Sequence, residues 1–189
     1  MVRLTERDKK IIEFLEEVKC ADTQTICNIF FNGALRACQI RLKKLVEFRY
    51  IKVYRENIIS PNIFYINRKP IQLKHSLILS RFIGQLYALG IEVIKYRVPL
   101  KVGNIIADGF ICIRYNGEVK IFLIEVENAK YFKTEKYVEL KAAGGYKEKL
   151  PYMPPIIVIT DKKVKTDPAL DIITLKIDLS NIENLLVKL

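Results

Sequence analysis

Hydrophobic residues near the start of the chain recur at steps of three and four, the spacing of amphipathic helices. The pattern predicts three helices, at about 5–18, from Asp22 or Thr23 to 31–33, and at about 34–48. Thr5, followed by acidic residues, is a typical N-cap for the first helix. The third helix has one apolar stripe, formed by Leu35, Cys38, Leu42, Leu45 and Val46. We therefore expect the chain to open with two short helices and a longer one.

The segment after the third helix alternates between apolar and polar residues, as a half-buried β-strand does. It comprises a strand at 50–54, a turn at 55–57 and a returning strand at 63–66. Three helices followed by a β-hairpin, in this order and at these lengths, predict a winged helix-turn-helix. That arrangement places the third helix in the major groove of DNA and the hairpin, or wing, against the phosphates. Residues 1–70 are therefore expected to form a DNA-binding domain.

Positive charge is concentrated on the two elements that would face DNA. Over the whole chain 32 Lys and Arg outnumber 21 Asp and Glu, and within 31–70 the counts are 9 and 2. We expect double-stranded DNA to be contacted by Arg36, Gln39, Ile40, Lys43 and Lys44 of the third helix and by Lys52 and Arg55 of the wing. A basic helix face is often only a solvated surface, and a winged domain can serve protein contacts alone. The local charge excess favours DNA.

The remaining two thirds of the chain, 71–189, follow a short linker at 67–70 and alternate between helical and strand patterns. The predicted elements are a helix at about 75–89, strands at 91–98, 105–115 and 118–127, a helix at about 133–149, a strand at 156–159, a strand at 172–177 and a helix at 180–187. The first six have the order αβββαβ. The fold class expected for the chain is thus α+β, with two domains.

A turn signal fixes the pairing of the middle strands. Asn116-Gly117 favours a two-residue turn, so that paired positions sum to 233 and Asp108 lies opposite Glu125. Ile106 would then lie opposite Glu127, and three carboxylates would gather at one strand end. Such a cluster needs a metal, a shared proton or a basic neighbour, and two carboxylates suit Mg²⁺. In the alternative, Glu127 lies in solvent and a bulge at Gly109 shifts the register; both interpretations remain open.

These acids, together with the αβββαβ order, resemble the PD-(D/E)xK nuclease superfamily. Asp108 and Glu125 match the metal-binding acids of that motif, whereas Glu127 stands where its lysine is expected. The resemblance implies a restriction-endonuclease-like domain at 71–189. A lysine could instead come from the following helix, where the candidates are Lys133, Lys136 and Lys141.

A second resemblance covers nearly the whole chain. Its segments are Leu4-Thr5-Glu6-Arg7-Asp8, Arg41-Leu42-Lys43-Lys44-Leu45, a wing, Ala107-Asp108-Gly109-Phe110, Phe122-Leu123-Ile124-Glu125-Val126-Glu127, a Tyr-bearing basic helix and Ile157-Val158-Ile159-Thr160. Together they are similar to the replication-relaxation family of plasmids and other mobile elements. The resemblance implies a winged-helix protein with a nuclease-like second domain. Phe48-Arg49 departs from it, because such helices commonly end in Gly.

Several classes of site and location are disfavoured by the composition. The four cysteines, Cys20, Cys27, Cys38 and Cys112, have no metal-ligand spacing, and His75 is the only histidine, so we expect no zinc site. The start of the chain is crowded with charge, and no run of 18 apolar residues occurs. We expect a cytoplasmic protein without membrane contact.

Three functions follow from these observations. In the first, a homodimer binds double-stranded DNA in plasmid replication, DNA processing or transcriptional control, and the second domain is catalytically silent. In the second, the chain is an Mg-dependent nuclease or nicking factor that uses Asp108, Glu125 and Glu127. In the third, it is a protein-interaction module of a replication complex. The absence of lysine at position 127 favours the first.

Overall fold

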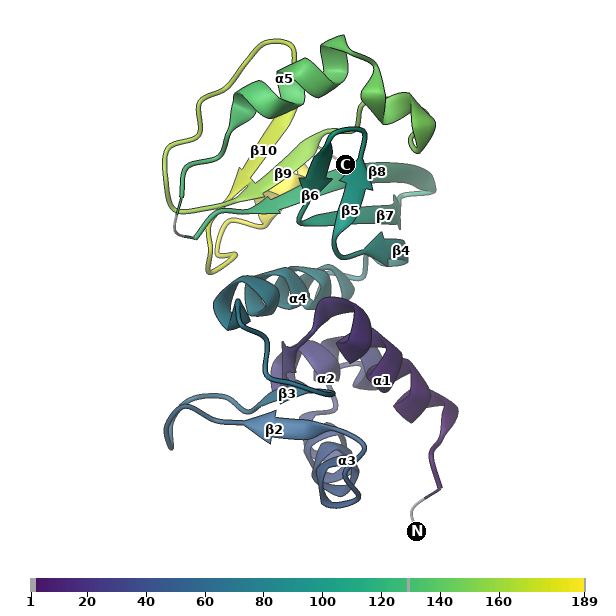
Figure 1. Ribbon diagram of the computed structural model, residues 1–189. Coiled ribbons are helices and arrows are strands. Elements are labelled where there is room, and N and C mark those ends of the chain that lie inside the picture. The colour runs from purple at the N-terminus through teal and green to yellow at the C-terminus, as the bar shows by residue number, and fades with distance from the viewer. Residues whose placement is uncertain (1–2, 129, 189) are drawn as a thin grey trace. The chain divides into compact units, whose positions relative to one another are not determined.

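The computed structural model describes residues 3–128 and 130–188, and shows an α+β chain with a mixed β-sheet. The chain divides into two compact units, one reaching Ile91 and the other starting at Glu92 (Figure 1). Each unit has its own sheet. No helix in the described part of the chain is both long and apolar enough to span a lipid bilayer.

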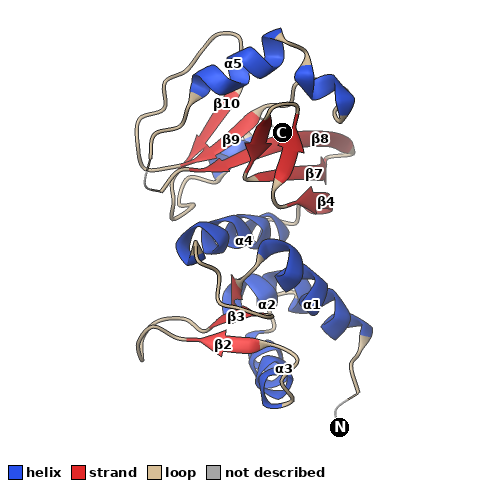
Figure 2. Cartoon of the chain, in the orientation of Figure 1, coloured by secondary structure: helices blue, strands red, loops and turns tan. Residues whose placement is uncertain are grey.

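The first unit consists of four helices and a small antiparallel sheet (Figure 2). Its elements are α1 (Glu6–Val18), β1 (Ala21–Asp22), α2 (Thr23–Phe31), α3 (Leu35–Glu47), β2 (Lys52–Tyr54), β3 (Ile63–Tyr65) and α4 (Leu73–Ala88). The strand order is β1-β3-β2. The three expected helices and the hairpin are confirmed to within a few residues at each end. β1 was not predicted, because two residues are too few for a periodic pattern.

Side-chain caps explain where the first two helices begin. Thr5 and Asp8 form a reciprocal capping box at the start of α1, in which each side chain accepts a backbone hydrogen bond from the other residue. Asp22 caps α2 by accepting a hydrogen bond from the backbone nitrogen of Thr25 at 2.8 Å. These caps match the two helix starts expected from the sequence.

α4 completes the first unit, so the expected boundary after residue 70 lies too early. The Arg81 Nε atom donates to Asp22 Oδ2 at 2.7 Å, which ties α4 to the cap of α2. A Cβ atom added at Gly84 would lie 3.0 Å from the methyl carbon of Thr25, so the two helices approach closely there. Leu77 packs with Cys20 and other buried residues. Residues 67–70 therefore connect two parts of one unit rather than two domains.

The second unit is built around a five-stranded mixed sheet, order β10-β9-β8-β7-β4. Its elements are β4 (Glu92–Arg97), β5 (Leu100–Val102), β6 (Ile105–Ala107), β7 (Gly109–Tyr115), β8 (Glu118–Val126), α5 (Thr134–Ala142), the 3-10 helix η1 (Gly145–Glu148), β9 (Ile156–Ile159), β10 (Ile172–Leu175) and α6 (Glu183–Leu186). β4, β7 and β8 pair antiparallel, and β8, β9 and β10 pair parallel.

The register expected for the central hairpin is confirmed where Gly109–Tyr115 pairs with Glu118–Ile124. Tyr115 pairs with Glu118 and Gly109 with Ile124, so the partners sum to 233 and no bulge occurs at Gly109. The turn residues Asn116 and Gly117 have φ values of 50° and 84°, as a two-residue turn of this type requires.

The strand expected at 105–115 is instead broken at Asp108. The Asp108 side chain accepts the hydrogen bond of the Val126 backbone nitrogen at 2.8 Å, and so takes the role of a ladder carbonyl. β6 then turns away and pairs with β5, so Ile106 lies opposite Lys101. The expected pairing of Ile106 with Glu127 is therefore wrong. The helix expected at 133–149 also ends early, because Gly144 takes a left-handed conformation before η1.

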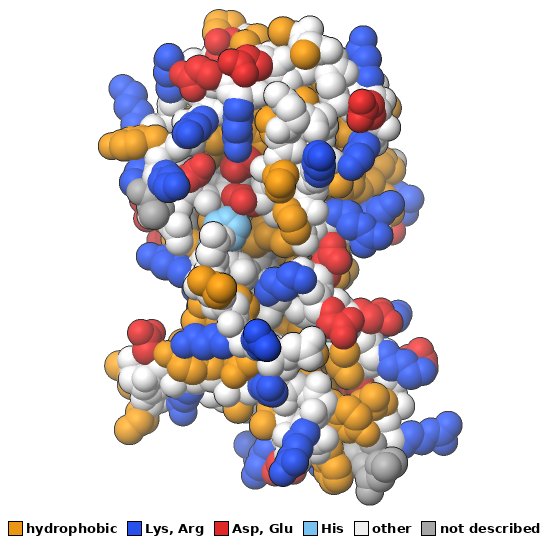
Figure 3. Space-filling model, in the orientation of Figure 1, with side chains coloured by type: hydrophobic (Ala, Val, Ile, Leu, Met, Phe, Trp, Pro, Cys, Tyr) orange, Lys and Arg blue, Asp and Glu red, His pale blue; other side chains and the backbone are white. Residues whose placement is uncertain are grey.

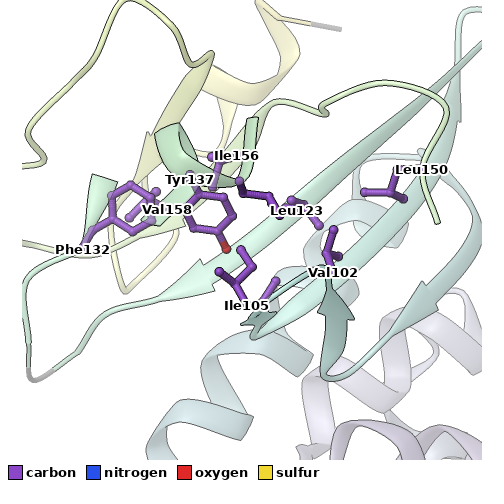
Figure 4. Close-up of a cluster of buried hydrophobic side chains, with 10 residues drawn as sticks. Val102, Ile105, Leu123, Phe132, Tyr137, Leu150, Ile156 and Val158 are labelled. Carbon is purple, nitrogen blue, oxygen red and sulfur yellow. The ribbon is translucent and has the colours of Figure 1, made fainter. Parts of the chain in front are cut away.

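α5 covers one face of the large sheet and buries its Tyr137 there (Figure 4). Around Tyr137 lie apolar side chains from β8, β9 and the β5–β6 hairpin; the labelled ones include Val102, Ile105, Leu123, Ile156 and Val158. Phe132 stacks on the Tyr137 ring with centroids 5.6 Å apart. Because side chains alternate along a strand, Glu125 shares the face of Leu123. The fold thus directs a carboxylate into the layer beneath α5.

Candidate functional site

The exposed side of α3 carries the residues expected to contact DNA. Cys38, Leu42 and Leu45 are buried on the opposite side of the helix. The exposed set, which we name the α3 face, consists of Arg36, Gln39, Ile40, Lys43 and Lys44. Ile40, the apolar member of this set, is 47% exposed. Lys and Arg side chains are visible on α3 and along the β2–β3 hairpin (Figure 3).

The hairpin lies beside this helix, and its two expected contact residues are exposed. The Lys52 ammonium donates to the Asn67 carbonyl at 2.7 Å, and the Arg55 Nε atom to the Ser60 carbonyl at 2.8 Å. A cavity of about 400 Å³ between helix and hairpin is lined by Thr23, Gln39, Leu42, Lys43, Val46, Glu47, Val53, Asn62 and Phe64. α3 and the β2–β3 hairpin therefore both border this cavity.

One basic residue of α3 is structural instead. The Arg41 guanidinium binds both carboxylate oxygens of Asp8, a residue with no exposed surface. Burial by itself would raise the pKa of Asp8, but the hydrogen bonds from Arg41 and Thr5 outweigh it and hold the pKa at about 2. Arg41 thus joins α3 to α1 and does not add to the α3 face. Both residues belong to the segments that carry the resemblance stated above.

The second candidate site lies where β8 meets the break between β6 and β7. Asp108 occupies the break, and Glu125, 3% exposed, stands near the end of β8. The expected approach of these two carboxylates is supported by their electrostatics, because the charge of Asp108 raises the pKa of Glu125. The structure brings Asp108 and Glu125 together, but it lacks the predicted pairing of Ile106 with Glu127.

α5 supplies two partners to Glu125. The Lys136 ammonium lies 2.9 Å from Glu125 Oε1, and the Tyr137 hydroxyl donates to the same oxygen. Burial is the largest influence on Glu125 and, with Asp108, raises its pKa to about 7 against the opposing hydrogen bonds from Tyr137 and Lys136. The pKa of Tyr137 is also raised, by burial and then by Glu125. We name Asp108, Glu125, Lys136 and Tyr137 the acidic site.

Of the other residues considered for this site, two lysines lie elsewhere, whereas the charge of Glu127 contributes to the raised pKa of Tyr137. Lys133 precedes α5, and the Lys141 ammonium donates to the Ala169 carbonyl at 2.5 Å. The Glu127 backbone is bound to β9, since its nitrogen donates to the Ile159 carbonyl and its carbonyl accepts from Thr160. Within 3–128 and 130–188, no group of three or more His, Cys, Asp or Glu side chains is arranged to hold a metal ion. The sequence named Lys136 as one of three lysines, and the structure selects it.

No protein-family model matches this chain, and neither does any curated protein. Two surfaces in the described part of the chain are candidates for function: the α3 face with the adjoining β2–β3 hairpin, and the acidic site.

Proposed function

We propose that the first unit binds double-stranded DNA as a winged helix-turn-helix, with the α3 face in the major groove. The observation that carries this proposal is that α3 is amphipathic. Cys38, Leu42 and Leu45 of its apolar stripe are buried, whereas Leu35 is 42% exposed, and the opposite side exposes Arg, Lys and Gln, the side chains that pair with base edges and phosphates. The adjoining β2–β3 hairpin takes the role of the wing, with Lys52 and Arg55 near the phosphates.

Two further observations support the proposal. The segment 31–70 has 9 basic and 2 acidic residues, and an excess of this kind supplies the salt-dependent part of DNA affinity. The bond between Asp8 and Arg41 fixes α3 on α1, so that the reading helix is presented on a rigid support. We propose that the chain acts as a homodimer in plasmid replication, DNA processing or transcriptional control.

The test is the affinity of the full chain for duplex DNA, measured by fluorescence anisotropy over a range of salt concentrations. Arg36→Ala and Lys43→Ala should each weaken binding by about 1–3 kcal/mol where the side chain reads a base, or lower the salt slope by about one unit where it binds a phosphate. Lys10→Ala, at an exposed position of α1, is the matched control. Unchanged affinity and salt slope in both α3 variants would overturn the proposal.

A second candidate function is favoured by Lys136. In the nuclease motif an acid pair works beside a lysine, and here Lys136 stands next to Glu125, in place of the residue missing at position 127. Asp108 and Glu125 are suitable ligands for Mg²⁺, which commonly uses one or two carboxylates. When bound, Mg²⁺ would activate water and stabilise the charge of a phosphoryl transition state. Lys136 would supply a second positive charge at the site, in addition to that of Mg²⁺.

Cleavage of supercoiled, linear duplex and single-stranded DNA with Mg²⁺ or Mn²⁺ tests this second function. Activity that disappears in Asp108→Ala and Lys136→Ala and persists in Lys141→Ala would support it, because Lys141 lies on the same helix but binds a backbone carbonyl. DNA binding by the full chain without cleavage of any of these substrates would leave the first function alone.

A further inference from the structure

The outer end of the β2–β3 hairpin displays two isoleucines to solvent. Ile58 and Ile59 are 87% and 93% exposed, and among the described large hydrophobic side chains only Ile71 is more exposed. Hydrophobic side chains are visible at this end of the hairpin (Figure 3). Neighbouring apolar residues that no part of the chain covers commonly mark a contact surface.

The loop that holds these residues is well bonded. The Asn57 side-chain oxygen accepts hydrogen bonds from the Ile59 nitrogen at 3.1 Å and from the Ser60 nitrogen and hydroxyl, both at 2.8 Å. The Arg55 Nε atom closes the other side by donating to the Ser60 carbonyl. These hydrogen bonds therefore fix the turn, while the two isoleucine side chains are exposed to solvent.

The charge of the hairpin that carries this tip favours a polyanion as its partner. Between positions 52 and 69 there are four basic residues, namely Lys52, Arg55, Arg68 and Lys69, and one acidic residue, Glu56. An apolar tip on a basic hairpin suits DNA, because apolar side chains can enter between stacked base pairs from the minor groove while basic side chains bind the phosphates along its edges. A hairpin beside a helix in the major groove crosses one phosphate backbone and then meets the adjacent minor groove.

We propose that Ile58 and Ile59 form an apolar wedge that enters the minor groove of bound DNA, partly unstacks one base step and bends the duplex. The inference rests on the proposed DNA binding by the first unit. Insertion of isoleucine or similar side chains between base steps kinks DNA by roughly 20–90°. Arg55, which is bonded to the tip loop at Ser60, would bind a phosphate beside the inserted tip, and Lys52, at the base of the hairpin, would bind one farther away.

The test measures the bend of a duplex of about 30 base pairs, chosen for binding to the full chain, by energy transfer between dyes at its ends. A 2-aminopurine placed at successive steps reports unstacking. The wild-type chain should bend the duplex and increase fluorescence at one step. Ile58→Ala with Ile59→Ala should leave the duplex straight and bind it on the order of tenfold more weakly. The Asn57 bonds do not involve the replaced side chains, so the turn is kept.

Two controls separate the wedge from other causes. Ile58→Leu with Ile59→Leu should preserve bending, and Ile71→Ala, at an equally exposed position outside the loop, should behave as wild type. A double alanine variant that bends DNA normally overturns the inference. So does one that only shifts the sedimentation of the free chain from dimer to monomer, since the tip would then bind a second copy. If the wild type binds no duplex, the proposed function fails as well; if it binds without bending, only the wedge fails.

Discussion

Two buried carboxylates of this chain, Asp8 and Glu125, have basic partners from another element and opposite titration behaviour. The pKa of Asp8 is held at about 2, whereas that of Glu125 is raised to about 7. Burial raises both values, so burial does not explain the difference. The difference between the two pKa values comes from the hydrogen-bond donors and the charged neighbours of each carboxylate.

Asp8 is fully provided with donors: two from Arg41 and two from Thr5. Glu125 receives one from Lys136 and one from Tyr137, and also faces the negative charge of Asp108. A permanently charged carboxylate such as Asp8 holds two helices together through its ion pair. A carboxylate such as Glu125 exchanges its proton near neutral pH, which is a property of reactive sites. The comparison therefore separates a structural ion pair from a candidate chemical one.

Removal of Arg41 should have the largest effect on stability. Arg41→Ala leaves Asp8 buried and charged without its main partner, and we expect the free energy of unfolding to fall by about 3–5 kcal/mol. Denaturant titration of the full chain, followed by circular dichroism, measures this loss. Lys43→Ala, an exposed position on the same helix, should stay within about 0.5 kcal/mol of wild type. A similar small change in Arg41→Ala would contradict the assignment of Asp8 and Arg41 as a structural pair.

Glu125→Gln should remove a pH dependence. The folded pKa of about 7 lies above the ordinary value of 4.5, so the folded state holds the proton more tightly than the unfolded state. The contribution of Glu125 is therefore most favourable below pH 4.5 and is lost as the pH rises towards 7. The loss amounts to ~3 kcal/mol in wild type and should be absent from the Gln variant. Unfolding measured at pH 4.5 and pH 8 gives both values; equal pH slopes would count against a protonated Glu125.

Lys136→Met should cost about 1.5–3 kcal/mol at pH 8, where Glu125 is charged, and much less at pH 5, where it holds a proton. The measurement is again the free energy of unfolding at the two pH values. Glu125 can take up a proton when Lys136 is lost, because burial and Asp108 already raise its pKa to about 7. A cost independent of pH would show that Lys136 acts through packing alone.

Thr5→Ala should have the smallest effect, about 1 kcal/mol, because it removes an N-cap and one of the donors to Asp8. It should also raise the pKa of Asp8, so the stability conferred by its charge would be lost at a higher pH during acid titration. Thr5→Ser retains the hydroxyl and should behave as wild type. If serine and alanine give equal losses, the hydroxyl plays no part in holding Asp8.

Local patterns in the sequence predicted most of the elements, because helices and strands with one buried face repeat their apolar residues at a fixed period. The Asn116-Gly117 turn fixed the register of β7 and β8 for a similar reason, since turn chemistry is local. The break at Asp108 was missed, because a side chain that replaces a backbone carbonyl leaves no trace in an alternating pattern. The membership of α4 in the first unit was missed as well, as it depends on contacts between distant segments such as Asp22 with Arg81.

The acidic site was predicted only in part, because the sequence indicates local strand pairing but not the packing of distant segments. Asp108 directly precedes β7 and Glu125 lies on β8, so the pairing of Gly109 with Ile124 brings the two acids together wherever the hairpin forms. Lys136 and Tyr137 reach the site from a separate helix, and the packing of α5 on the sheet decides which of its lysines approaches Glu125. Spacing along the chain could name candidates on that helix, but it could not choose among them.

Because Cys20 is buried beneath α4, the reactivity of its thiol reports how often α4 separates from the rest of the first unit. Its thiol has no exposed surface, packs against Leu77 and is directed at the Leu73 carbonyl 3.9 Å away. Burial also raises the thiol pKa to about 12. An alkylating reagent can therefore reach a reactive thiolate only when α4 lifts from the unit, and the rate of labelling counts those openings. Cys112, which is partly exposed in the other unit, provides the reference rate within the same molecule.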